Sequence, residues 1–141
     1  MEEVKIVSFI KRLSSDTVND KINWKRLDTY HNRTSDTPKT LSNLLWEDEF
    51  RHIDYHNSYV ATLAPGPGDV FLIYEDDDPG RTETPHTTGY KIYLYDDSEK
   101  EASYLSCPAY AVYQLLNAIQ SYIAKSESSA EKFIDDYLSL E

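Results

Sequence analysis

The segment PGPGD, residues 65–69, constrains the fold of this chain more than any other feature. Two Pro-Gly pairs stand between apolar, strand-forming runs at residues 58–64 and 70–75. Proline and glycine in this arrangement predict a turn in which glycine is free to adopt positive φ. The two runs are therefore expected to pair as neighbouring strands.

Further segments extend this pattern on both sides. Residues 49–55 and 89–97 alternate between apolar and polar side chains, as strands with two different faces do. The acidic run at residues 96–101 reads as a hairpin turn into a short strand at residues 102–106. The simplest architecture is an antiparallel meander of four or five strands.

The N-terminal third predicts one helix and a short anchoring segment. Residues 3–13 carry apolar side chains at the spacing of one helical face, and Ser14, Ser15 and Asp16 are expected to end that helix. Residues 21–27 predict a turn or strand anchored on the core. A short helix is expected at residues 39–46.

The C-terminal third predicts a pair of helices. Pro108 suits a first helical position, and an apolar face follows it, made of Val112, Leu115, Leu116, Ile119 and Ile123. The polar residues 126–129 interrupt this pattern, and Ser128 with Glu131 matches a capping box. A second apolar face then consists of Ala130, Phe133, Ile134, Tyr137 and Leu138. The expected fold is α+β, a single acidic domain over residues 1–141. In it the N-terminal helix accompanies the meander, and the C-terminal helix pair packs on one sheet face.

Charge and cysteine content limit the classes of partner. Residues 1–46 hold eight Lys/Arg and six Asp/Glu, a net of +2, whereas residues 47–141 hold six and nineteen, a net of −13. The sum is the stated −11. A surface of that sign repels phosphates and anionic lipids, so direct contact with nucleic acid or a membrane is not expected. With one cysteine, no signal peptide and no long apolar run, the chain reads as soluble and cytoplasmic.

The best candidate for metal chemistry is HIDYH, residues 52–56. On a strand His52, Asp54 and His56 project from the same face, and two imidazoles with a carboxylate form a known metal set. They would span ~13 Å at about 3.3 Å per residue, too far for one ion without a bulge. Neither a metal nor a cofactor is therefore expected. Cys107, before Pro108, reads as a small junction residue rather than a nucleophile, and no phosphate loop or hydrolase signature occurs.

The remaining pattern is the placement of tyrosine residues next to aspartate and glutamate residues. The chain has twelve tyrosines, several beside carboxylates, and tyrosine is enriched in protein interfaces. Residues 75–88 form a long acidic connection whose aspartates stand ~3.3 Å apart along an extended chain, similar to the roughly 3.4 Å between charges along a DNA strand. The expected partner-binding residues are Glu75, Asp76, Asp77, Asp78, Glu83, Tyr93, Tyr95, Asp96 and Asp97.

These features favour a non-enzymatic protein that binds a basic, nucleic-acid-binding protein and inhibits or regulates it. In size, acidity and lack of a catalytic signature the chain resembles small accessory proteins of phages and mobile elements, including anti-CRISPR proteins and DNA mimics. That resemblance is of general character and assigns no residue roles. An antitoxin or immunity protein covering a toxin is one alternative, and a small metal-dependent enzyme using His52, Asp54 and His56 is another.

Overall fold

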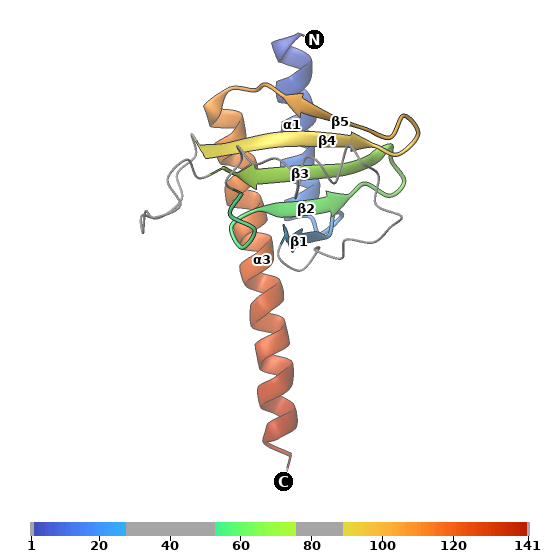
Figure 1. The fold of residues 1–141 in the computed structure, drawn as a ribbon. Helices are drawn as coiled ribbons and strands as arrows, with labels where there is room; N and C mark the ends of the chain where they lie inside the picture. Colours follow the sequence, from blue (N-terminus) through green and yellow to red (C-terminus); the bar gives the residue numbers. More distant parts are fainter. Residues whose placement is uncertain (1, 28–52, 76–88, 141) are drawn as a thin grey trace.

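The computed structural model describes residues 2–27, 53–75 and 89–140, in which two helices pack on a five-stranded sheet (Figure 1). The elements are α1 (Glu3–Val18), β1 (Trp24–Arg26), β2 (Tyr59–Thr62), β3 (Gly68–Tyr74), β4 (Tyr90–Asp96), β5 (Glu101–Leu105) and α3 (Ala109–Leu138). The strand order is β1-β2-β3-β4-β5, and every neighbouring pair is antiparallel. The α+β fold and the antiparallel meander are therefore confirmed. The helix expected at residues 39–46 lies outside the described residues.

Glycine is required in the turn between β2 and β3 for a reason different from the one expected. No glycine among the described residues has positive φ. Instead, a Cβ atom on Gly68 would collide with the carbonyl oxygen of Tyr95 on the neighbouring strand β4. The turn is closed by a hydrogen bond of 2.9 Å from the Leu63 amide to the Gly68 carbonyl. Close approach of two backbones therefore selects glycine here.

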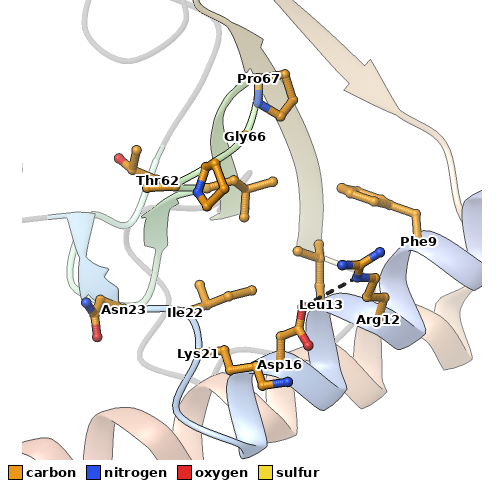
Figure 2. Close-up of a pocket in the computed structure, with 13 residues that line it drawn as sticks. Phe9, Arg12, Leu13, Asp16, Lys21, Ile22, Asn23, Thr62, Gly66 and Pro67 are labelled. Carbon is orange, nitrogen blue, oxygen red and sulfur yellow. Dashed lines mark ion pairs between the residues drawn. The ribbon is translucent and has the colours of Figure 1, made fainter.

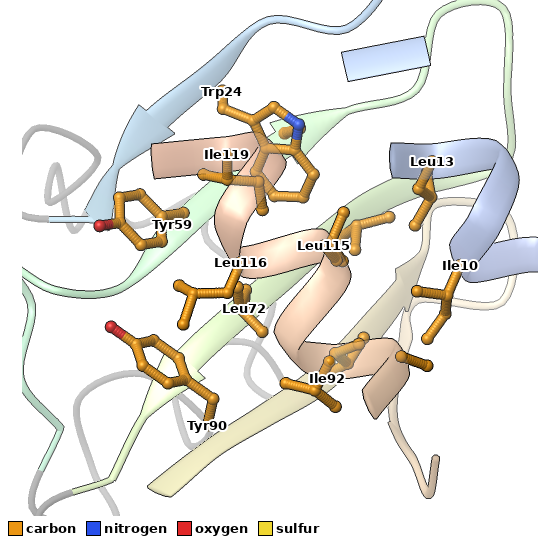
Figure 3. Close-up of a cluster of buried hydrophobic side chains, with 14 of the residues drawn as sticks. Ile10, Leu13, Trp24, Tyr59, Leu72, Tyr90, Ile92, Leu115, Leu116 and Ile119 are labelled. Atoms are coloured by element: carbon orange, nitrogen blue, oxygen red, sulfur yellow. The ribbon is translucent and has the colours of Figure 1, made fainter. Parts of the chain in front are cut away.

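The sheet buries side chains on both faces, because successive residues of a strand project to opposite faces and β3 has apolar residues at consecutive positions. On the face covered by α1 and α3, Ile10, Leu72, Ile92, Leu115 and Ile119 all have 0% exposure (Figure 3). The opposite face carries a second buried cluster of Leu27, Val60, Phe71, Ile73, Tyr93 and Tyr95. The expected division of residues 89–97 between two faces is confirmed.

Helix α1 extends beyond its expected end and continues to Val18. Ser14 and Thr17 are buried, and their hydroxyls donate to the Ile10 and Leu13 carbonyls at 2.8 and 2.7 Å. These bonds satisfy the polar side chains within the helix, so they do not end it. The Trp24 indole N–H donates to the Thr17 hydroxyl at 2.9 Å, which anchors β1 on α1.

The expected C-terminal helix pair is wrong, because α3 is one continuous helix of 30 residues. Residues 126–129 contain neither glycine nor proline, so nothing there forces the backbone out of the helix. Ser128, the expected cap, lies inside α3, and the neighbouring Ser129 hydroxyl donates to the Lys125 carbonyl at 3.0 Å. At 1.5 Å per residue, α3 is about 45 Å long. Even so, neither α3 nor any other helix in the described part of the chain is long and apolar enough to cross a membrane.

Candidate protein-interaction surfaces

Five carboxylates lie at the end of the sheet where β3 begins, β4 ends and β5 begins. They belong to Asp69, Asp96, Asp97, Glu99 and Glu101, which we call the acidic end. The strand register places Asp96 opposite Glu101, and Asp69 opposite Tyr95. Asp97, Glu99 and Glu101 are exposed. Residues 96–101 contain four acids and one lysine, so this end of the sheet has excess negative charge.

Asp96 organises the hairpin that carries these acids. Its carboxylate accepts hydrogen bonds from the Glu99 amide at 2.9 Å, and from the Ser98 hydroxyl and amide at 2.7 and 2.8 Å. These donors lower the pKa of Asp96, because they favour its charged form. Asp96 therefore fixes the turn, and its exposed neighbours are the side chains available for contact.

Negative charges at the acidic end influence one another. Burial raises the pKa of Asp69, the hydrogen bond from the Thr62 hydroxyl opposes that rise, and the charge of Asp97 adds to it. Tyr95 also has a raised pKa, caused by burial and then by Asp97 and Asp69. Its hydroxyl is buried without a hydrogen-bond partner among the described residues. The charges of Asp69 and Asp97 are therefore near enough to disfavour ionisation of neighbouring groups at the acidic end.

The structure separates the other expected contact residues. The Glu75 carboxylate pairs with Lys91 at 2.6 Å and accepts a hydrogen bond from the Tyr93 hydroxyl at 2.9 Å. Tyr93 and Tyr95 are only 6% and 5% exposed, so their rings fill the second core cluster instead of forming open contact area. Asp76, Asp77, Asp78 and Glu83 lie outside the described residues. A contact role for that acidic segment stays a prediction.

The HIDYH segment does not form the expected strand over its described residues. Ile53 makes an isolated bridge with Glu75, and a turn follows. The Asp54 carboxylate accepts hydrogen bonds from the Asn57 amide at 3.1 Å and from its side-chain nitrogen at 2.7 Å. His56 is exposed, and His52 lies outside the described residues. Within residues 2–27, 53–75 and 89–140, no group of three His, Cys, Asp or Glu side chains is placed to hold a metal ion.

Cys107 also lacks the environment of a nucleophile. It packs against the helix-covered core cluster. Burial raises the pKa of its thiol, whereas a reactive cysteine needs a lowered pKa. This placement agrees with the interpretation of Cys107 as a junction residue.

A cleft of about 460 Å³ lies between α1 and the segment that joins β2 to β3 (Figure 2). Its walls combine apolar residues, among them Phe9, Leu13 and Pro67, with polar ones such as Lys21 and Asn23. At its mouth Arg12 and Asp16 form an ion pair of 3.6 Å. Sequence patterns could not reveal this cleft, because its lining comes from segments far apart in the chain. Convergent buried polar groups, which orient small ligands, are not found among its described lining residues.

The second half of α3 differs most from the prediction, which packed its apolar face on the sheet. Ile123 is the last buried residue of the helix, and the helix continues well beyond the sheet in Figure 1. We call residues 124–138 the distal helix. Its apolar stripe consists of Ala130, Phe133, Ile134, Tyr137 and Leu138. Phe133 and Tyr137 are 74% and 71% exposed, so the residues expected to form core are in solvent.

Polar contacts join the base of the distal helix to β1 and to the segment between α1 and β1. Arg26 of β1 pairs with Glu127 at 2.8 Å, and Lys125 pairs with Asp20 at 3.0 Å. The Tyr122 hydroxyl donates to the Asn23 side chain at 2.9 Å. These contacts set the direction in which the distal helix leaves the body.

Comparison with known proteins finds no matching family model, no similar curated protein and no similar solved structure. The function must therefore be inferred from the chain's own residues.

Proposed function

We propose that this chain is a non-enzymatic protein that binds a partner with a basic surface and thereby inhibits or regulates it. The observation that carries the proposal is the acidic end, where exposed carboxylates of Asp97, Glu99 and Glu101 stand on a hairpin fixed by Asp96. A rigid turn holds these charges in place before binding, so a partner does not have to order them.

The charge of the whole chain supports the same class of partner. A net charge of −11 steers association towards basic surfaces and away from nucleic acid. Residues on adjacent antiparallel strands stand about 5 Å apart, and successive residues about 3.3 Å apart. The second spacing is close to the roughly 3.4 Å per charge along a nucleic-acid strand, whereas the first is wider. A nucleic-acid-binding protein is therefore the favoured partner, as for an anti-CRISPR protein or another DNA mimic.

Affinity capture from a lysate of the source cell tests this proposal when it is combined with matched charge variants. The test variant carries Asp97→Asn and Glu101→Gln at the acidic end. The control carries Asp135→Asn and Glu131→Gln on the distal helix, which changes the net charge by the same amount. Neither Glu131 nor Asp135 has an ion-pair partner in the described part of the chain.

The captured protein should be retained by wild type and by the control at low salt, and released at high salt. The acidic-end variant should bind it with slower association and a shallower dependence on salt. Equal association rates and equal salt slopes for the two variants would rule out the acidic end as the contact surface.

A further inference from the structure

The stripe on the distal helix repeats the buried face of the same helix. Tyr137 follows Ile119 by 18 residues (137 − 119), which is five turns at 3.6 residues per turn. The same offset relates further pairs of buried and exposed residues, namely Val112 with Ala130, Leu115 with Phe133, and Leu116 with Ile134. The apolar face is therefore continuous along α3, and the sheet and α1 cover only its first half.

The exposed area of this stripe is large for a chain that stays monomeric. Aromatic side chains bury about 150–250 Å² each, so Phe133 and Tyr137 at 74% and 71% exposure leave about 220–360 Å² in water. Ile134, Leu138 and Leu140 are 55%, 68% and 79% exposed. With Leu140, which lies just beyond the end of α3, the exposed apolar area at and next to the stripe is roughly 500–600 Å², the upper end for the largest apolar patch on a typical monomer. That is most of the ~800 Å² that each partner contributes to a standard interface.

We propose that the stripe is a dimer interface, in which the distal helices of two copies of this chain pack side by side in antiparallel orientation. This inference does not depend on the proposed function.

The placement of charge on the distal helix favours a second copy over a basic partner. Two of the carboxylates that border the stripe are already neutralised within the chain: Glu127 by Arg26 at 2.8 Å and Asp136 by Lys132 at 3.0 Å. At 100° per residue, Asp135 lies on the far side of the helix from the stripe, whereas Glu131 lies about 20° from Leu138 at the border. Within the described part of the distal helix, Glu131 is therefore the one carboxylate without an ion pair that borders the stripe, so this face offers little charge to a basic partner.

The antiparallel orientation follows from the shared face. Because the stripe continues the face that the sheet and α1 cover, the body of each copy projects on the side where the other helix must lie. Parallel helices would place both bodies at the same level and on facing sides, where they would collide. Antiparallel helices place the bodies at opposite ends of the pair. Each distal helix then occupies the apolar face beyond the end of its partner's α1.

Light scattering and sedimentation of the full chain test the dimer. The protein concentration is varied between about 1 µM and 100 µM, a range that brackets micromolar affinity. As the concentration rises, the measured mass of the wild type should approach about 33 kDa, twice the chain mass of 16.3 kDa. Phe133→Glu, and separately Tyr137→Glu, should stay at the monomer mass. Ser128→Glu adds the same charge on the opposite side of the helix, and it should leave the dimer intact.

Several outcomes would overturn the proposal. They are a wild type that remains monomeric at the highest concentration, a mass above the dimer, or a dimer unaffected by both stripe substitutions. Both stripe variants should retain the wild-type circular dichroism spectrum, since the replaced side chains are exposed. Loss of that spectrum in both would place the stripe in the core and contradict the proposal.

Cysteine cross-linking in a Cys107→Ser background tests the orientation. Residues 126 and 140 stand at opposite ends of the distal segment, seven residues on either side of residue 133. In an antiparallel pair, Ser126→Cys in one copy should cross-link to Leu140→Cys in the other, and neither variant should cross-link to itself. Self-cross-linking of either variant would show a parallel arrangement and refute the geometry.

Discussion

Substitution of two isoleucines on the same helix would test the division of α3 into a buried and an exposed half. Ile119 has 0% exposure, whereas Ile134, fifteen residues later, is 55% exposed. We expect Ile119→Ala to destabilise the fold strongly and Ile134→Ala to change the free energy of unfolding very little. Both substitutions are made in the Phe133→Glu background, so that self-association does not contribute.

The magnitude follows from what each substitution removes. Isoleucine loses three carbon atoms on truncation to alanine, worth about 0.8 kcal/mol each when buried, or about 2.4 kcal/mol. The cavity left at a fully buried position adds about 1 kcal/mol, which gives a total of about 3–4 kcal/mol for Ile119. A surface substitution such as Ile134→Ala usually changes stability by less than about 0.5 kcal/mol.

Urea unfolding followed by far-ultraviolet circular dichroism measures both effects. The midpoint for Ile119→Ala should fall while the slope stays that of the parent, because the surface exposed on unfolding hardly changes. Destabilisation of the two variants by the same amount would refute the division of α3. A loss below about 1 kcal/mol for Ile119→Ala would show that this residue is not in a packed core.

Four further predictions concern single features of the chain. Gly68→Ala should lower the melting temperature markedly, since its Cβ atom would collide with the Tyr95 carbonyl; an unchanged melt would contradict the close approach of β3 and β4. In the folded state the pKa of Asp69 is raised above its ordinary value of 3.8. At pH values above the folded-state pKa the ionised carboxylate therefore destabilises the fold, and this destabilisation disappears as the pH falls. Asp69→Asn should therefore stabilise the fold in urea titrations at pH 7 and lose that advantage below pH 3.8. Chelator treatment should leave the thermal melt unchanged, and unfolding by chelator would instead favour a metal site at residues 52–56. Replacing Asp76, Asp77 and Asp78 by asparagine should leave the melting temperature nearly unchanged and slow association with the partner; an equal rate and salt slope would assign that segment no contact role.

The sheet could be predicted from the sequence because its signals are local. The turn at residues 65–69 and the acidic hairpin at residues 96–101 stand between runs with a period of two, and each signal involves neighbours in the chain. Pairing of consecutive strands then follows with little further information. The end of α1 was predicted too early because Ser14, Ser15 and Asp16 resemble helix breakers, whereas the Ser14 hydroxyl bonds within the helix.

The distal helix could not be predicted in the same way. An apolar face at helical spacing shows which side of a helix avoids water, but it does not show whether the same chain covers that side. Phe133 and Ile134 have the same spacing as the buried Leu115 and Leu116, and only the tertiary structure separates the two pairs. Part of the acidic end was predictable, since Asp96 and Asp97 stood out beside Tyr95. Asp69 was missed because the strand register brings it there from another segment.

The two proposals have a joint physical consequence that neither has alone. An antiparallel dimer carries one acidic end on each body, and the bodies stand at opposite ends of the paired helices. A partner that presents several basic surfaces, such as a protein assembled along a nucleic acid, would then engage both ends at once. The second contact would form at the effective concentration set by the rigid helix pair, so the apparent affinity would rise above that of one end without any new contact. Phe133→Glu would remove this gain while leaving every carboxylate of the acidic end in place. Dimerisation would therefore tune the strength of binding, and the acidic end would set its specificity.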